Sequence, residues 1–513
     1  MLMTIDDNYE DGAPVVSVRP RQFSWIALFL STVFLLVANG RHTIPVAMWL
    51  AMFLLFRFVR TQPARIGLPL TWLVLFLTSA FQFRGMAPVP GIFYYILWAV
   101  YGFTMFLPFW IDRVVAPRIR GFISTLVFPC AWVTMEWLVA SFTPYGSWNS
   151  LAYTQHENLV LLQLIAVTGL YGLSFLIAWF ASVGYWVSEH GLTHAKTRRG
   201  ALVFAAVMVV ILSGGGMRLV VFAPDAPTVR IASLTSPDLD LFEGVEGGAA
   251  AALSGQVSAA DVDRIRINAD AILDELLRRA DQEVQAGARI IMWGETNSFS
   301  LKQDEPAMIA RGAEFAREKG IYLGMSPAVF DGESDMPLEN KIILINPQGE
   351  VSFEYWKAIP VPGPDASLQA VNDGRIKIVD SPYGRLGAAI CFDMDFPGHL
   401  KQAGRQDADI MLIPSNDWRE IDPWHSHMAR FRAVEQGFNM VRHVSNGFSL
   451  ATDYQGRVLA SMDHFATDQR VMVANVPTQG VRTVYSRIGD LFAWLCITGL
   501  VATVGLSRLR ARL

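Results

Sequence analysis

The chain has 513 residues, of which 52% are hydrophobic and only 17% are charged, with a formal net charge of −4 at pH 7. This composition is too apolar for an ordinary soluble protein, and the slightly acidic balance argues against a nucleic-acid partner. The apolar residues concentrate at 23–222 and 488–506, whereas 229–478 has a normal globular composition. We therefore expect an α-helical transmembrane bundle that carries one soluble α/β domain.

The apolar runs predict eight membrane spans, because a helix needs roughly 20 residues to cross the hydrocarbon core. Residues 1–22 are polar at their start and are predicted to form a cytoplasmic N-terminal tail. Seven spans would form the membrane domain 23–222, and the eighth would be a C-terminal helix at 488–506. The expected spans are 23–39, 44–59, 68–83, 92–111, 121–142, 158–187, 200–222 and 488–506.

The basic residues of the short connections predict the orientation of the bundle. Alternate connections carry fourteen Lys and Arg residues, whereas the connections between them carry only Arg41 and Arg84. Positive charge accumulates on the cytoplasmic side of a membrane. Both termini are therefore expected in the cytoplasm and the 229–478 domain outside it.

The soluble domain alternates strand patterns with helical patterns, which is typical of an α/β domain with mixed sheets. Helices are expected at 261–285, 304–319 and 424–436. Strands are expected at 229–235, 289–293, 321–329, 409–414 and 439–445, with a hairpin at 342–357, two strands within 374–391 and closing strands within 448–476.

Three polar residues follow apolar or aromatic runs in this domain: Glu295, Lys357 and Cys391. Acyl transfer needs a nucleophile, a base for its proton and a cation for the oxyanion, and these residue types supply all three. The backbone N–H of Phe392 would be a second oxyanion donor. Each residue alone has a simpler explanation, since Cys391 could be a core residue, Lys357 could end a hairpin and Glu295 could cap a helix.

Other polar residues are weaker candidates. Glu136 lies within an expected span and Trp148 in a loop, so each is either functional or an ordinary bundle or interfacial residue. Asp393 and Asn416 are expected to support the site. The spacing of His425, His427 and His443 fits no strong zinc motif, and we expect no metal or other cofactor.

Three local sequences resemble the triad motifs of the nitrilase, or carbon–nitrogen hydrolase, superfamily. They are Trp293-Gly294-Glu295-Thr296, Tyr355-Trp356-Lys357 and Ile390-Cys391-Phe392-Asp393-Met394-Asp395-Phe396-Pro397, and 414–418 and 427–435 resemble the downstream motifs. With seven spans before this domain and one after it, the chain is similar to the apolipoprotein N-acyltransferase family. The loop 144–153 resembles the membrane-domain signature of that family.

This resemblance implies a protein of the bacterial inner membrane. Its catalytic domain would be an αββα sandwich and would lie in the periplasm. It implies that Cys391 takes an acyl chain from a phospholipid as a thioester and passes it to the N-terminal amine of a diacylglyceryl-cysteine lipoprotein. Glu295 would be the general base, Lys357 the oxyanion stabiliser and Cys391 the nucleophile.

Two segments differ from the family pattern. After the lysine, the family carries a Pro-Phe-Gly-Glu type segment, where this chain has Asp365 as a displaced substitute. Asp393 stands where typical acyltransferases have a glutamate. Three alternatives therefore stay open: an acyltransferase with another lipid amine acceptor, a membrane-anchored amidase, and a receptor or scaffold without catalysis.

Overall fold

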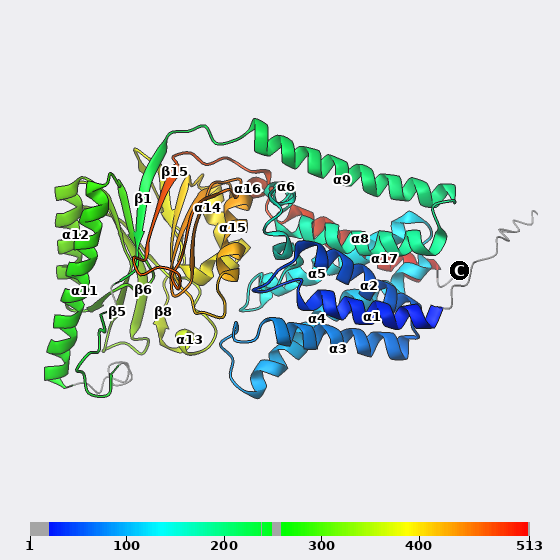
Figure 1. The fold of residues 1–513 in the computed structure, drawn as a ribbon, viewed down its shortest axis with the longest axis horizontal. Coiled ribbons are helices and arrows are strands. Elements are labelled where there is room, and N and C mark those ends of the chain that lie inside the picture. The colour runs from blue at the N-terminus through cyan, green and yellow to red at the C-terminus, as the bar shows by residue number, and fades with distance from the viewer. Residues whose placement is uncertain (1–19, 237–238, 249–257, 511–513) are drawn as a thin grey trace, which may run out of the picture.

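The computed structural model describes residues 20–236, 239–248 and 258–510. A bundle of long helices lies end-on against an α/β domain, and the described ends of the chain lie at the far end of the bundle (Figure 1). Most of the expected N-terminal tail, residues 1–19, lies outside the described residues. The bundle and the α/β domain confirm the expected fold class.

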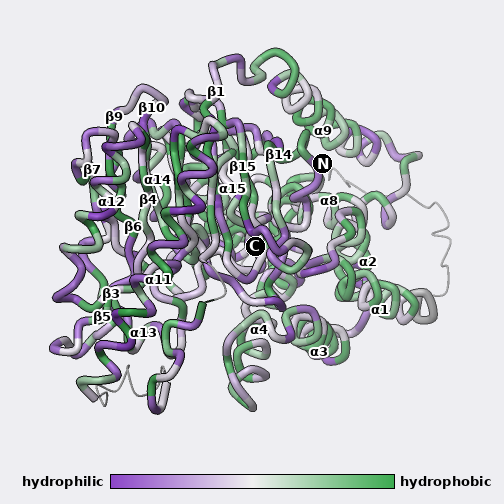
Figure 2. The backbone as a smooth tube through the Cα atoms, turned by 60° about the vertical axis from the view of Figure 1, so that its left-hand side comes forward, coloured by the Kyte–Doolittle hydropathy of each residue, from purple (hydrophilic) through white to green (hydrophobic). Residues whose placement is uncertain are grey.

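Eight helices form the long elements of the bundle. They are α1 (Pro20–Leu36), α2 (Pro45–Thr61), α3 (Ala64–Gln82), α4 (Ile92–Val115), α5 (Val127–Phe142), α8 (Leu170–His190), α9 (Ala195–Val221) and α17 (Leu491–Arg510). Hydrophobic colour is widespread on the labelled helices α1, α2 and α3 (Figure 2). Within the described residues, six helices, α3, α4, α5, α8, α9 and α17, are long and apolar enough to cross a membrane. The expected count of eight spans stays a prediction, because α1 and α2 have only 17 residues each.

The expected span at 158–187 is wrong as a single helix. The chain forms α6 (Leu159–Leu162) and α7 (Ile165–Thr168) before α8 begins. Gly169 separates α7 from α8 at φ 64°, and a Cβ there would lie 2.5 Å from Tyr485 Cε2. Only glycine fits this break, and it directs α6 and α7 toward the α/β domain (Figure 1).

Two sheets pack face to face in the α/β domain. The first has the order β15-β1-β2-β4-β6-β5-β3, with β7 and β8 also paired to β6, and the second has the order β14-β13-β12-β11-β10-β9. The strands of the first sheet are β1 (Thr228–Leu234), β2 (Ile290–Trp293), β3 (Ser298–Leu301), β4 (Tyr322–Met325), β5 (Pro327–Phe330), β6 (Leu338–Ile345), β7 (Val351–Trp356), β8 (Gln369–Ala370) and β15 (Val471–Pro477). Those of the second are β9 (Ile378–Ser381), β10 (Gly384–Ala388), β11 (Ile410–Asn416), β12 (Asn439–Ser445), β13 (Phe448–Thr452) and β14 (Val458–Asp463).

Two pairs of helices cover the outer faces of the sheets (Figure 1). Helices α11 (Ala259–Gln285) and α12 (Glu305–Lys319) cover the first sheet, and α14 (Pro397–Arg405) and α15 (Trp424–Gln436) cover the second. In each sheet the central strands are parallel: β1 pairs with β2 and β2 with β4, while β11 lies between β10 and β12. The carboxyl ends of parallel strands meet at one edge, which is where the expected site residues lie.

Helix α15 joins the α/β domain to the bundle. Twelve of its 13 residues are buried, so the helix has no solvent-exposed face. Arg430 donates to the carbonyl of His156 over 3.1 Å, and Glu435 Oε1 accepts the backbone N–H of Leu170 at 2.7 Å. A helix that would be half exposed in an isolated α/β domain is thus enclosed between the second sheet and the bundle.

Candidate active site

The structure brings Glu295 and Lys357 into direct contact. Glu295 follows β2 and Lys357 follows β7, and the Lys357 Nζ donates to Glu295 Oε1 at 2.8 Å. Both side chains are buried. A buried ion pair of this kind holds its position only when the remaining polar atoms are also satisfied.

Further donors satisfy the Glu295 carboxylate. Asn340 Nδ2 donates to Oε1 at 2.7 Å, and the backbone N–H of Asn416 donates to Oε2 at 2.7 Å. The carbonyl of Asn340 also accepts the backbone N–H of Lys357 at 2.9 Å. Asn340 therefore orients both members of the pair, although no local motif in the sequence points to it.

Cys391 lies at the start of a tight turn, the 3-10 helix η4 (Cys391–Asp395), three residues after β10. Its backbone has φ 48°, a conformation that costs a non-glycine residue about 1–3 kcal/mol. Asp393 stabilises the turn, because its Oδ2 accepts Ile390 N–H at 2.9 Å and Tyr355 O–H at 2.7 Å. The Asp393 carboxylate is thus committed to backbone and tyrosine donors.

The electrostatic surroundings keep the Cys391 sulfur protonated at rest. Burial raises the pKa of the thiol well above its usual range, and Glu295 raises it further, while Lys357 lowers it. Burial lowers the pKa of Lys357, but Glu295 and Cys391 outweigh that effect and raise it overall. The resting site therefore holds a neutral thiol and an ammonium group.

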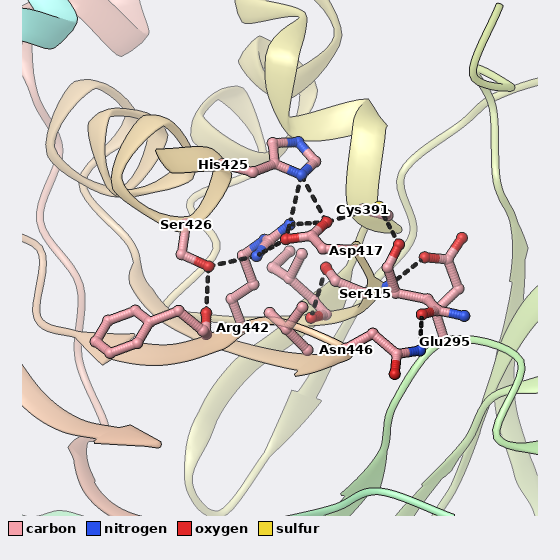
Figure 3. Close-up of polar contacts among 12 residues, drawn as sticks. Glu295, Cys391, Ser415, Asp417, His425, Ser426, Arg442 and Asn446 are labelled. Atoms are coloured by element: carbon pink, nitrogen blue, oxygen red, sulfur yellow. Dashed lines mark hydrogen bonds and ion pairs between the residues drawn. The ribbon is translucent and has the colours of Figure 1, made fainter. Parts of the chain in front are cut away.

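A second buried cluster lies beside Cys391 (Figure 3). Asp417 Oδ1 lies 3.9 Å from Cys391 Sγ, 2.8 Å from His425 Nδ1 and 3.1 Å from Arg442 Nη2. Burial opposes ionisation of Asp417, but Arg442 and His425 hold its pKa well below the usual range. The sequence did not indicate Asp417 or Arg442, although Asp417 directly follows the candidate Asn416.

The candidate histidines separate into different environments. His427 stacks on His156 with ring centroids 4.2 Å apart, and His443 Nε2 lies 3.0 Å from Thr235 Oγ1. Ligand atoms of Cys391, Asp417 and His425 lie within 4.8 Å of one another. We do not assign them as metal ligands, because the Arg442 guanidinium lies against both Asp417 and His425 and would repel a cation.

An apolar cavity of about 290 Å³ extends from Cys391 into the bundle. Phe392, Trp148 and His425 are among its lining residues, and residues of α4, of α5, of the loops before α4 and after α5, and of two loops of the α/β domain line the remainder. The bundle side includes Leu97, Trp98, Val100, Tyr101, Thr104, Val139 and Phe142. This shape suits a long apolar chain whose reactive end reaches Cys391.

Of the remaining candidates, Trp148 lines this cavity, whereas Glu136 and Asp365 are not among its lining residues. Trp148 Nε1 donates to Asp395 Oδ2 at 2.8 Å, which joins the bundle loop to η4. Glu136 lies on α5 and accepts from the Leu151 N–H at 2.9 Å and from the Ser150 hydroxyl at 3.0 Å. It therefore anchors the end of the loop that carries Trp148. In α13 (Pro364–Leu368), burial raises the pKa of Asp365, an effect that Lys357 opposes.

Two family models match the chain in succession. The apolipoprotein N-acyltransferase N-terminal domain matches residues 13–183, and the carbon-nitrogen hydrolase family matches residues 251–485. Together they span most of the bundle and most of the α/β domain.

Two proteins with sequences similar to this chain share one name. The apolipoprotein N-acyltransferase of Geobacter metallireducens is 26% identical over 414 residues, which cover 76% of this chain and 75% of that protein. The protein of the same name from Rickettsia typhi is 23% identical over 367 residues, covering 66% of this chain and 67% of its own. Among solved structures, an amidase from Nesterenkonia sp. is similar at 18% identity and a TM-score of 0.38, covering 53% of this chain and 96% of that one.

Proposed function

Because the chain belongs to the apolipoprotein N-acyltransferase family of the carbon-nitrogen hydrolase superfamily, we propose that it acylates the N-terminal amine of a diacylglyceryl-cysteine lipoprotein. The acyl chain would come from a phospholipid and pass through a thioester on Cys391. We further propose that the protein lies in a bacterial inner membrane with its catalytic domain in the periplasm.

The apolar cavity that joins Cys391 to the bundle is the observation that carries this proposal. Moving an acyl chain from the bilayer into water costs about 0.8 kcal/mol of free energy per methylene group. A cavity walled by α4 and α5 avoids this loss, because the chain exchanges one apolar environment for another. A site for small water-soluble amides has no need of such a wall.

In the first step, the Cys391 sulfur attacks the ester carbonyl carbon of the phospholipid while Glu295 accepts the thiol proton. The Lys357 ammonium and the Phe392 backbone N–H would stabilise the negative oxygen of the tetrahedral intermediate. The C–O bond then breaks, and the leaving alcohol of the lysophospholipid takes the proton from Glu295. The product is an acyl thioester on Cys391.

In the second step, the lipoprotein amine attacks the thioester carbonyl and Glu295 accepts a proton from the nitrogen. The C–S bond breaks, the sulfur recovers a proton from Glu295, and an amide is released. Trp148, Asn416 and Asp393 would hold the site in shape during both steps. We propose that Asp365, which interacts electrostatically with Lys357, partly replaces the glutamate of other family members.

The two-step path predicts a trapped intermediate. Incubation of the purified protein with a phospholipid labelled in its acyl chains should place one hydroxylamine-sensitive label on the Cys391 peptide. The Cys391→Ala variant should carry none, with an unchanged melting temperature as the control. Addition of a diacylglyceryl-cysteine peptide should then move the label to the peptide amine.

Two results would contradict this proposal. Release of ammonia from small amides without any lipid-derived acyl-enzyme would instead assign an amidase. Labelling of Cys391 followed by transfer only to other lipid amines would retain the mechanism and replace the acceptor.

A further inference from the structure

His425 occupies an unusual position for a histidine beside a nucleophilic thiol. It lies in the first turn of α15, is 2% exposed and lines the apolar cavity together with Cys391. Both of its ring nitrogens face carboxylates: Nδ1 lies 2.8 Å from Asp417 Oδ1, and Nε2 lies 3.3 Å from Asp395 Oδ1. The ring therefore bridges two acids on opposite sides.

These contacts form a continuous chain from the bundle to the sulfur. Trp148 Nε1 donates to Asp395 Oδ2, Asp395 faces His425, and His425 faces Asp417, whose Oδ1 lies 3.9 Å from Cys391 Sγ. The neighbouring Ser147 also donates to the Asp395 carbonyl, from its N–H at 2.8 Å and its hydroxyl at 2.7 Å. His425 is the central member of this chain.

The charges around His425 favour a protonated ring. The charged groups that face it are Asp395 on η4, Asp417 in the loop after β11 and Arg442 on β12, whose Nη2 lies 2.8 Å from Nδ1. Burial lowers the pKa of His425, but the two carboxylates outweigh both burial and Arg442 and raise it to about 9. At neutral pH the His425 ring is therefore protonated, facing Asp395 on one side and Asp417 on the other.

We propose that His425 is a positioning residue for the nucleophile, whose imidazolium neutralises the Asp395–Asp417 pair and so limits the cost of forming negative charge on the Cys391 sulfur. Without the imidazolium, Arg442 alone would offset the negative charge of Asp395 and Asp417, and the excess of negative charge close to the sulfur would disfavour the thiolate. This role rests on the proposed function only in taking Cys391 as the nucleophile. It assigns His425 no contact with the transferred acyl group.

Cys391 alkylation in the full-length protein in detergent tests the role without any lipid substrate. The rate of iodoacetamide modification should be followed on the Cys391 peptide by mass spectrometry between pH 6 and pH 10.5. In the unmodified protein the logarithm of this rate should rise with pH and bend near pH 9, where His425 loses its proton. In His425→Gln the bend should be absent, and the rate at pH 7 should be about tenfold lower, which corresponds to about one pKa unit.

The two profiles should converge above pH 9, because a neutral imidazole and a glutamine then carry the same charge. A merely structural role would lower the His425→Gln rate by one factor at every pH, and that outcome overturns the proposal. His425→Lys should restore most of the rate at pH 7. His427→Gln, two residues away and stacked on His156, is the matched control and should keep the unmodified profile.

The profile of the unmodified protein decides the question even if His425→Gln does not fold, since a straight profile through pH 9 contradicts a titrating imidazolium. The result of the alkylation experiment can also be distinguished from the result of the acyl-transfer experiment. A bend near pH 9 in a protein that takes no acyl group from phospholipid would retain this role and overturn the proposed function alone.

Discussion

Among single residues, Asn340 shows how the Glu295–Lys357 pair depends on neutral neighbours. Its side chain donates to Glu295 Oε1, and its carbonyl accepts the Lys357 backbone N–H. Replacing Asn340 by alanine removes only the first contact and leaves a buried carboxylate one donor short. Hydrogen bonds to charged groups contribute about 1.5–3 kcal/mol each.

We therefore expect Asn340→Ala to slow thioester formation on Cys391 at least about tenfold, since about 1.4 kcal/mol corresponds to a factor of ten. The measurement is the rate of label transfer from phospholipid, together with the melting temperature of the purified protein. Asn372→Ala is the control, because Asn372 is exposed and its Oδ1 accepts the nearby Gly374 N–H. Equal rates in the two variants would show that Asn340 has no part in orienting Glu295.

The sequence predicted Glu295, Lys357 and Cys391 because each directly follows a recognisable run of apolar residues. The direct contact of Glu295 and Lys357 agrees with that expectation, while their catalytic roles stay a prediction. The sequence did not predict a role for Asn340, Arg442 or Asp417. Their contacts join residues that are distant in the sequence, and no local spacing encodes such contacts. His425 was considered only as a metal ligand, since a single histidine gives no sign of the carboxylates that tertiary structure brings to it.

At the scale of elements, the loop before η3 (Leu151–Gln155) connects the bundle to the nucleophile turn. Gly146 has φ 57°, and a Cβ there would lie 2.5 Å from the Asp395 carbonyl oxygen. The next two residues, Ser147 and Trp148, both donate to Asp395. Only a glycine allows this loop to approach η4 so closely.

The substitution Gly146→Ala should push the loop away from Asp395 and reduce acyl transfer from phospholipid at least about tenfold, because overpacking at a close backbone contact costs about 1–3 kcal/mol. Gly91→Ala is a matched control: Gly91 has φ 61°, and nothing lies within 4 Å of its added Cβ. Both substitutions place a side chain at a positive φ, but only Gly146→Ala adds a close contact. A similar loss in both would attribute the effect to strain alone.

Secondary-structure elements could be predicted where a segment lies in one kind of environment and its apolar residues repeat with one period. The helix expected at 424–436 is α15. The strand expected at 321–329 is two strands, β4 and β5, on either side of Ser326. Both pair with β6, but β4 also pairs with β2 and β5 with β3. Strands β3 and β8 and helix α14 were not predicted, since two to nine residues carry too little periodicity.

In the whole molecule, the α/β domain and the described ends of the chain lie at opposite ends of the long axis (Figure 1). Arg60 pairs with Asp112 at 3.2 Å, and Arg510 lies 3.4 Å from the Arg118 carbonyl, so connections that are distant in sequence meet at the far end. The orientation inferred from the basic connections stays a prediction.

We expect both termini in the cytoplasm and the catalytic domain on the outer side of the membrane. Green fluorescent protein fused after Leu513 should fluoresce and alkaline phosphatase fused there should be inactive, because the first folds in the cytoplasm and the second requires disulfides that form outside it. In spheroplasts, added protease should cleave within 229–478 while an N-terminal epitope stays protected. The reverse pattern would place Cys391 in the cytosol. The inverted orientation would also require the fourteen basic residues of the alternate connections to cross the membrane, which is the physical reason to expect it not to occur.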